Sequence, residues 1–244
     1  MTLLSVVLFL TAVLLPSFPA NGQDPGFAAL STTLQQVQTE IVNKHNDLRR
    51  NVSPQASDML KMMWDSEAQV NAQNWANKCN YHHSQEEDRR TNIKCGENLF
   101  MSSVPTSWSN AIQSWTAEAH DFVFGVGAKN PDAPIGHFTQ AVWATSFRVG
   151  CGISYCPSQG TLAYFYVCQY CPVGNHVTRQ YSPYKPGPPC SSCPGYCDNK
   201  LCTNSCNYED GYGNCPDLKK MVTCEHEVVK SSCQASCNCE GKIY

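Results

Sequence analysis

The sequence predicts an α+β domain followed by a small region that disulfides hold together. Helical periodicity dominates the chain up to about residue 120, whereas two β-rich segments follow one another after residue 146. Cysteine is unevenly spread, since residues 23–171 hold six and residues 190–244 hold ten. Helices that precede a strand pair are typical of α+β domains, in which the helices cover a sheet.

Residues 2–15 are almost wholly apolar, and Pro16 and the small residues Ala20 and Gly22 follow them. The run is shorter than the ~20 residues that a membrane span needs. It is typical of a secretory signal peptide, residues 1–22, cleaved before Gln23; a hydrophobic anchor is the alternative. Sixteen cysteines favour secretion, because disulfides persist outside the cytosol, and the even count allows eight bridges. No second apolar run follows, so we expect a protein that is not integral to a membrane.

Three helices are predicted in the first region. The first has one face of residues at three- and four-residue steps: Leu34, Val37, Ile41, His45 and Leu48. Pro54 stops this helix, and a second runs from about Asp65 through Trp75. The third begins near Thr106 or Ser107, both suitable caps. Its buried side is expected to hold Ile112, Trp115 and Ala119.

Two strands are predicted at the end of the first region. FRVGCGISYC (147–156) and TLAYFYVCQYC (161–171) are β-branched, aromatic and roughly alternating, with CPSQG between them as the turn. Aromatic residues at this spacing mostly belong to a core. The segment FVFGVGAKNPDAP (122–134) is rich in Gly and Pro, which makes it a candidate exposed recognition loop.

The stretch YSPYKPGPP (181–189) has four prolines in nine residues and is interpreted as an extended linker. After it, residues 190–244 have too few apolar side chains for a core, so disulfides must supply stability at roughly 2–4 kcal/mol each. Zinc binding by Cys190 and Cys193 is the alternative for this cysteine-rich region.

The net charge of −3, with no Lys/Arg cluster larger than a pair, argues against a nucleic-acid partner. Asn51, in Asn-Val-Ser, is the candidate glycosylation site, although Pro54 directly after the sequon disfavours its use.

Four segments of the first region carry a resemblance to a known family: NKHNDLR (43–49), CGENL (95–99), GHFTQAVW (136–143) and YVCQYCPVGN (166–175). With the ten cysteines of the tail, the chain resembles the mammalian cysteine-rich secretory proteins of the CAP superfamily. The resemblance implies a CAP α-β-α sandwich over residues 23–175. It also implies a linker and two-disulfide hinge over 176–205, and a small helical, ion-channel-regulator-like (ShKT-like) domain over 206–244.

The resemblance also implies the disulfide pairs, which spacing alone could not give. The implied pairs are Cys79–Cys156, Cys95–Cys171, Cys151–Cys168, Cys190–Cys197, Cys193–Cys202, Cys206–Cys239, Cys215–Cys233 and Cys224–Cys237.

In this family two histidines and two glutamates line a cleft. Matched by motif they are His83, Glu97, Glu118 and His137, with His82 as the alternative to His83. Two neutral imidazoles can bind Zn²⁺ at ~2.0–2.1 Å, with glutamates as weak ligands or as groups that orient the imidazoles. We favour weakly bound Zn²⁺ that the protein does not require. A buried hydrogen-bond network without metal is the second possibility, and catalysis the third.

A hydrolase or protease is the alternative enzymatic interpretation, because Ser84 beside His83 suggests a Ser–His–Glu triad. Neighbouring residues rarely face each other as nucleophile and base, and no nucleophile elbow marks Ser84. We therefore predict that the protein is not an enzyme.

The resemblance implies that the terminal domain regulates ion channels of the Ca²⁺ or ryanodine type, and the channel-contact candidates are Tyr212, Lys219 and Lys220. Residues 190–244 carry five Lys against seven Asp/Glu, which weakens capture by a cation-conducting pore. A disulfide-stapled spacer is the alternative. For the sandwich, the resemblance implies adhesion to an egg or Sertoli cell-surface protein, with sterol or lipid binding as the alternative. We expect secretion, with storage in the sperm acrosome as one destination.

Overall fold

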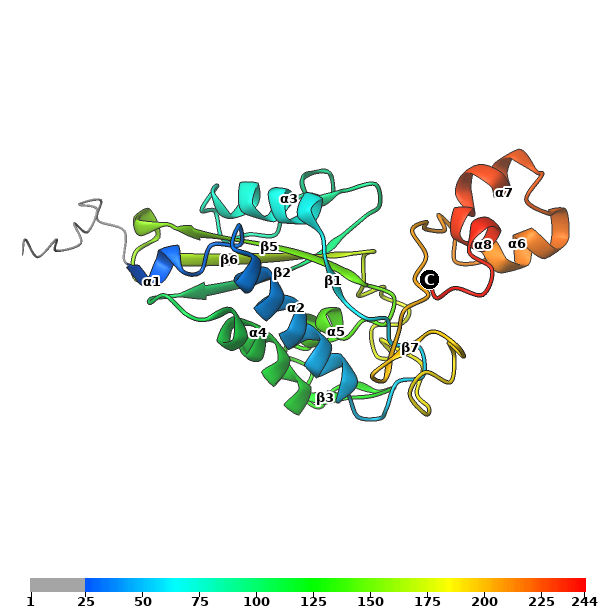
Figure 1. Ribbon diagram of the computed structural model, residues 1–244, viewed down its shortest axis with the longest axis horizontal. Coiled ribbons are helices and arrows are strands. Elements are labelled where there is room, and N and C mark those ends of the chain that lie inside the picture. Colours follow the sequence, from blue (N-terminus) through cyan, green and yellow to red (C-terminus); the bar gives the residue numbers. More distant parts are fainter. Residues whose placement is uncertain (1–24) are drawn as a thin grey trace, which may run out of the picture.

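The computed structural model describes residues 25–244, and the expected signal peptide, residues 1–22, lies outside the described residues. A four-stranded sheet of order β1-β5-β6-β2 forms the centre. Its strands are β1 (Met63–Trp64), β5 (Arg148–Tyr155), β6 (Tyr164–Cys171) and β2 (Gly96–Ser102). Strand β1 runs parallel to β5, and the other pairs are antiparallel. Helix α3 covers one face, while α2, α4 and α5 cover the other, which gives an α-β-α sandwich (Figure 1).

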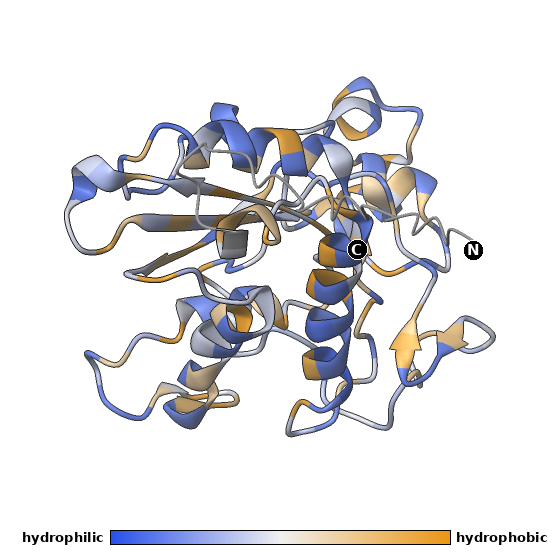
Figure 2. Cartoon of the chain, turned by 60° about the vertical axis from the view of Figure 1, so that its left-hand side comes forward, coloured by the Kyte–Doolittle hydropathy of each residue, from blue (hydrophilic) through white to orange (hydrophobic). Residues whose placement is uncertain are grey.

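The three predicted helices are confirmed as α2 (Gln35–Arg50), α3 (Ser66–Ala76) and α4 (Trp108–Thr116). Caps set two of their starts. The Asp65 carboxylate accepts from the backbone N–H groups of Glu67 and Ala68, at 2.9 and 3.0 Å, and Ser107 accepts from Asn110 at 3.2 Å. Hydrophilic and apolar residues alternate along the helices, as expected of helices that bury one side (Figure 2).

The prediction that Ala119 lies on the buried side of the third helix is wrong. Helix α4 ends at Thr116 and continues as a short 3₁₀ helix, η2 (Ala117–His120). A 3₁₀ helix has fewer residues per turn than an α-helix, so positions beyond Thr116 leave the apolar side. Ala119 is consequently exposed.

The sequence predicted two strands, β5 and β6, but β2 was missed. It pairs antiparallel with β6 from Gly96 opposite Tyr170 to Ser102 opposite Tyr164. GENLFMS has no β-branched residue and only one aromatic, so composition gives little sign of a strand. The pairing makes β2 the edge of the sheet.

Helix α3 lies unusually close to strand β5. A Cβ built on Gly150 would lie 2.1 Å from the backbone N of Gln69, and one on Gly152 would lie 2.4 Å from the Cα of Gln73. The helix backbone therefore rests directly on the strand, and only glycine fits at these two positions. Trp75 and Ala72 then pack with Phe165 and Val167 on this face.

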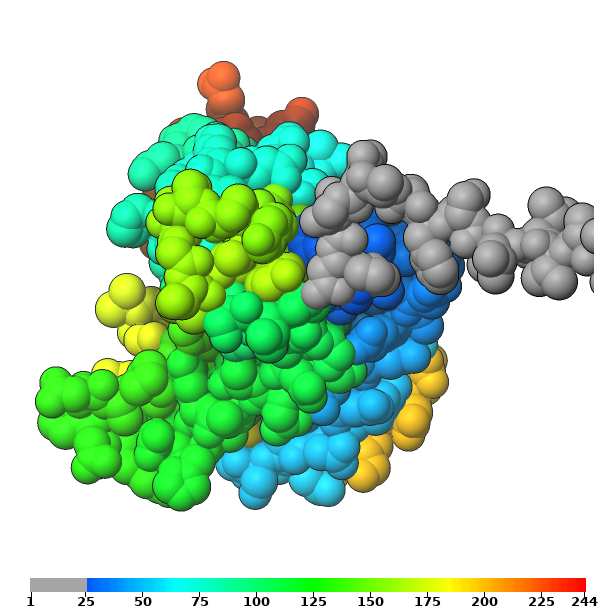
Figure 3. Space-filling model, turned by 90° about the vertical axis from the view of Figure 1, so that its left-hand side faces the viewer, coloured from blue at the N-terminus to red at the C-terminus, as the bar shows by residue number. Residues whose placement is uncertain are grey.

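The predicted recognition loop forms a small hairpin of β3 (Phe122–Val123) and β4 (Gly127–Ala128). It protrudes from the body in the space-filling view (Figure 3, green). Phe122 packs against Phe138 and Phe124 against Tyr184, with ring centroids 5.4 and 4.9 Å apart. Its aromatic residues are thus turned inward, and Val126 is its most exposed apolar side chain.

The proline-rich stretch 181–189, interpreted as an extended linker, contains turns, bends and one isolated bridge, and it is packed rather than free. Ser57 N–H donates to the Lys185 carbonyl at 2.8 Å, and Ala56 forms a bridge with Pro186. The hinge that follows holds β7 (Cys197–Asp198) and β8 (Leu201–Cys202), and Leu201 is buried in a cluster with residues of the first region. The hinge therefore packs against the sandwich through Leu201.

The terminal region folds as α6 (Cys215–Val222), α7 (Glu227–Ser232) and α8 (Gln234–Asn238) around its disulfides. Eight disulfides form within the described residues, in the pairs that the family resemblance implies. The zinc alternative for Cys190 and Cys193 is wrong, because both sulfurs are in disulfides. None of the described helices is long and apolar enough to cross a membrane. The remaining short helices are α1 (Pro25–Ala28), η1 (Glu87–Arg89), α5 (Gly136–Ala141) and η3 (Pro157–Gln159).

Candidate functional site

The Glu97 carboxylate, on edge strand β2, is almost fully buried and receives four hydrogen bonds. Its Oε1 accepts from His83 Nδ1 at 3.0 Å and from Ser84 N–H at 2.9 Å. Its Oε2 accepts from Ser84 Oγ at 2.7 Å and from Gln169 Nε2 at 3.3 Å. Gln169 lies opposite Glu97 in the β2–β6 register, so the sheet itself supplies that donor.

These donors decide the charge of Glu97. Burial by itself would raise the pKa of this carboxyl group, but the hydrogen bonds from His83, Ser84 and Gln169 together outweigh burial and lower the pKa. The carboxylate is therefore ionised at neutral pH. It holds the His83 ring with Nδ1 toward the protein, while 60 % of the His83 side chain stays exposed.

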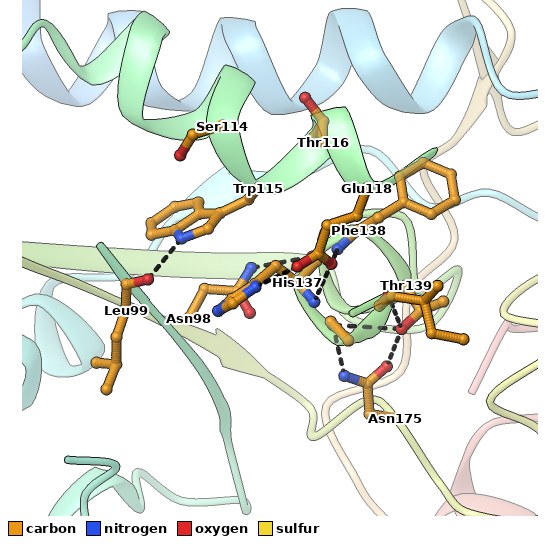
Figure 4. A network of polar contacts seen from close by, with 12 residues as sticks. Asn98, Leu99, Ser114, Trp115, Thr116, Glu118, His137, Phe138, Thr139 and Asn175 are labelled. Atoms are coloured by element: carbon orange, nitrogen blue, oxygen red, sulfur yellow. Dashed lines mark hydrogen bonds and ion pairs between the residues drawn. The ribbon is translucent and has the colours of Figure 1, made fainter. Parts of the chain in front are cut away.

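In a second pair, a glutamate likewise accepts from the Nδ1 of a histidine. Glu118, from η2, accepts from His137 Nδ1 at 2.6 Å and from the backbone N–H groups of His137 and Phe138 at 2.8 and 3.0 Å (Figure 4). These N–H groups belong to the first turn of α5, so Glu118 fixes both the imidazole and the helix that carries it. The indole ring of Trp115 stacks on His137, with ring centroids 6.4 Å apart and planes 17° apart.

A buried polar chain supports His137 from behind. Asn98 Nδ2 donates to the His137 carbonyl at 3.0 Å and lies 3.4 Å from the Tyr170 hydroxyl. That hydroxyl is 2.9 Å from His45 Nε2, whose Nδ1 lies 2.8 Å from the Ile41 carbonyl. Sequence reasoning missed Asn98 and Tyr170 as supporting residues. The sequence placed His45 on the apolar face of the first helix but did not predict its contact with Tyr170.

The structure brings the four predicted residues into two pairs, His83 with Glu97 and His137 with Glu118. Glu97 and Asn98 are successive residues of β2, and successive side chains point to opposite faces of a strand. Glu97 thus holds the His83 ring, while Asn98 bonds the backbone of His137. Within residues 25–244, the one group of three potential ligand atoms within 4.8 Å of each other consists of disulfide sulfurs, not of these side chains.

In both pairs the carboxylate holds Nδ1, and no described residue bonds Nε2. This is the arrangement of a metal-binding histidine, whose other nitrogen donates to a carboxylate that fixes its orientation. The His137 side chain is 36 % exposed, less than that of His83. The donor set fits a metal ion that two imidazoles bind weakly, with the glutamates behind them.

The alternatives at this site can be compared in the structure. It is His83, not His82, whose ring contacts Glu97. Ser84 is buried and donates its hydroxyl to Glu97, so it does not pair with His83 as a nucleophile pairs with its base. The Ser–His–Glu arrangement of a protease is therefore absent here.

The remaining predicted residues lie apart from these pairs. Lys219 donates to the Ser236 carbonyl at 2.8 Å, and Lys220 pairs with Asp217 at 3.4 Å, while Tyr212 is exposed. Asn51 is exposed, but its Nδ2 donates to the Asp47 carbonyl at 2.7 Å.

The sandwich, the paired histidines and the disulfide-rich tail define a protein of the CAP class. A model of the cysteine-rich secretory protein family matches residues 42–170, and a Crisp model matches residues 190–244. The chain belongs to the cysteine-rich secretory protein family.

Several named relatives are similar over almost the whole chain. Human cysteine-rich secretory protein 3 is 62 % identical over all of both chains, and human cysteine-rich secretory protein 2 is 61 % identical over 98 % of each. These two identities are nearly equal. Cysteine-rich venom protein helothermine from Heloderma horridum horridum is 50 % identical over all of both chains.

Two solved structures share the fold. Na-ASP-1 is 33 % identical with a TM-score of 0.59, and the match covers 69 % of this chain and 47 % of that one. The chain thus spans about half the length of Na-ASP-1. The structure titled NaASP2 with Zn²⁺ is 29 % identical with a TM-score of 0.56, over 77 % of this chain and all of that one.

Proposed function

We propose that the protein is a secreted, non-enzymatic binding protein. Its CAP sandwich binds Zn²⁺ weakly and mediates cell adhesion in gamete interaction, and its terminal domain regulates an ion channel. One observation carries the zinc proposal: two histidines each present Nε2 while an oriented glutamate holds Nδ1. Eight disulfides support secretion, since such bonds persist in oxidising compartments.

The chemistry of the two pairs supports weak zinc binding. A bound Zn²⁺ would supply Lewis acidity or a bridge to a ligand of a partner molecule. Structural zinc sites use four protein ligands and catalytic sites three, whereas this set offers two imidazoles. The carboxylates orient these rings. The similar structure with Zn²⁺ in its title is consistent with this proposal.

Zinc titration of single variants tests the proposal by calorimetry. We expect His83→Ala and His137→Ala each to weaken binding at least about tenfold, and Glu118→Gln to weaken it about 10–100-fold, the usual range for such a supporting carboxylate. His120→Ala is the matched control, because His120 also lies beside a carboxylate, Asp121 at 3.2 Å, but is 85 % exposed. Unchanged affinity in both His83→Ala and His137→Ala would leave the pairs a structural role only.

The adhesion and channel roles rest on the family resemblance and on exposed surface. The β3–β4 hairpin presents Val123 and Val126 to solvent, and the tail presents Met221 and Val228. Exposed apolar side chains on otherwise polar surfaces are suited to partner contacts. Patch-clamp recording with micromolar full-length protein on Ca²⁺-conducting channels tests the channel role, with Met221→Glu as the variant. No change of current with the wild-type protein would refute it.

Lipid binding is the second candidate, and a specific groove favours it. A groove of about 460 Å³ lies between α2, β1 and the hinge, and its apolar lining includes Val42, Met62, Met63 and Trp64. This volume falls in the range of small-molecule sites, roughly 300–1,000 Å³. A sterol-binding assay with Met63→Glu tests it, since a carboxylate in the groove should abolish binding there. Equal binding by variant and wild type would exclude this groove.

A further inference from the structure

The terminal domain (residues 206–244) contacts the CAP sandwich through very few polar groups. Among the described residues, one hydrogen bond joins it to residues 25–189: the Lys94 backbone N–H donates to Glu209 Oε2 at 3.1 Å. Beside this contact lies a groove of about 1270 Å³, with walls from both domains. The position of the terminal domain thus depends on the short chain link at the hinge, on local packing and on Glu209.

Both ends of this hydrogen bond are held firmly in their own domains. Lys94 precedes Cys95, which is bonded to Cys171 at the end of β6. Glu209 precedes Asp210, whose carboxylate accepts from the backbone N–H and the hydroxyl of Ser236 on α8. The contact can therefore break by separation of the two domains, while the Cys95–Cys171 disulfide and the Asp210–Ser236 hydrogen bonds stay intact.

The surroundings of Glu209 are positively charged. Burial raises the pKa of the Glu209 carboxyl group, and the hydrogen bond from Lys94 and the charges of Lys94, Arg90 and Arg148 act in the opposite direction. The Lys94 ammonium group is directed to Glu86, at 2.8 Å, so the Lys94 backbone rather than its side chain meets Glu209. Arg148 is tied to Asp65 at 3.1 Å and to Asn92 at 3.0 Å. Lys94, Arg90 and Arg148 thus form a basic rim beside Glu209. Contacts with Glu86, Asp65 and Asn92 fix the side chains of Lys94 and Arg148 in this rim.

We propose that Glu209 is an electrostatic clasp that holds the terminal domain against the basic rim of the sandwich and so sets the width of the groove between them. When the carboxylate is removed, or when salt screens it, the domain swings away and the groove opens. The exposed lining of the groove then becomes available to a partner. The clasp does not depend on zinc binding or on channel regulation.

The Lys94 amide proton reports the clasp directly, because Glu209 is its acceptor. In the full-length protein, we expect Glu209→Ala to speed hydrogen exchange at Lys94 at least about tenfold, the change that corresponds to 1.4 kcal/mol. Small-angle scattering should show a larger radius of gyration. Glu209→Gln keeps an acceptor oxygen without the charge, so an intermediate result is expected. The amides of β5 and β6 serve as a reference for an intact sandwich.

Two comparisons make the test decisive. Glu225→Ala removes an exposed carboxylate of the same domain and should leave Lys94 exchange unchanged. In the wild type, raising salt from 0.1 to 1 M shortens the screening length from about 10 to about 3 Å and should speed Lys94 exchange. If Glu209→Ala exchanges like wild type, or Glu209→Gln and high salt have no effect, the electrostatic clasp is wrong.

Discussion

Replacement of Arg49 is the sharpest test of what holds the sandwich together. Its guanidinium group is buried and lies among backbone carbonyl groups. Nε donates to Leu60 at 2.9 Å, Nη1 to Ala141 and Trp143 at 3.1 and 2.8 Å, and Nη2 to Ala144 at 3.0 Å. One side chain thus joins helix α2 to the segment before β1, to the last residue of α5 and to the segment that follows α5.

The expected loss follows from these four bonds. Arg49→Met removes four buried hydrogen bonds, and at about 1 kcal/mol each unfolding becomes easier by about 4 kcal/mol. The Trp143 and Ala144 carbonyls keep backbone donors, the N–H groups of Ser146 and Leu60, so only the Leu60 and Ala141 carbonyls lose the donor described here. An opposing effect exists, because methionine removes the desolvation cost of a buried charge. Burial is strong enough to lower the pKa of Arg49 to about 9. Arg49→Lys keeps the charge but offers three N–H groups from one atom, so at least one bond is lost, at about 1.5–3 kcal/mol.

Urea unfolding at pH 7 without reductant, followed by tryptophan fluorescence, measures these losses as shifts of the midpoint at constant slope. Arg50→Met is the matched control. Arg50 pairs with Asp47 at 2.8 Å and donates to the Asn199 carbonyl at 3.1 Å, and both contacts are exposed. Such contacts contribute less than about 1 kcal/mol. If Arg49→Met is as stable as the wild type, the desolvation of the guanidinium outweighs its four hydrogen bonds, and the reasoning fails.

Two further predictions concern the interior. Burial lowers the pKa of His45 from 6.5 to about 4, so the folded protein keeps this imidazole neutral where the unfolded chain takes up a proton. The free energy of unfolding should therefore fall as pH drops from 6.5 toward 4, by up to about 1.4 kcal/mol per pH unit, and His45→Gln should flatten this part of the profile. Gly152→Ala places a Cβ 2.4 Å from the Cα of Gln73 and should cost about 1–3 kcal/mol, seen as a lower Tm. Gly213→Ala, with open space around it, is the control, and equal Tm values would mean that α3 shifts without cost.

Much of the helical framework could be predicted because its signals are local. Periodic apolar residues, Asp65 and Ser107 as caps, and Pro54 as a stop each act within a few residues. Strand β2 could not be predicted in this way. Its residues form a strand because β6 offers a complementary edge some 70 positions later in the chain, and no local composition encodes that pairing.

The site shows the same division between local and distant information. The resemblance placed His83, Glu97, Glu118 and His137 by motif, and each pair is in contact. The donors that keep Glu97 ionised include Gln169, which reaches it only through the sheet register. Asn98, which bonds the His137 carbonyl, belongs to the same strand β2, which sequence reasoning did not find.

The terminal domain buries few apolar side chains and leaves others exposed. Its apolar residues looked too few for a core, and the structure buries mainly cysteines with Val229 and Ala235. Because the disulfides restrict the unfolded chain, stability does not require Met221 and Val228 to be buried. Met221 is 77 % exposed on α6, and Val228 is exposed on α7. The cysteines therefore take the place of an apolar core in this domain, and Met221 and Val228 remain on its surface.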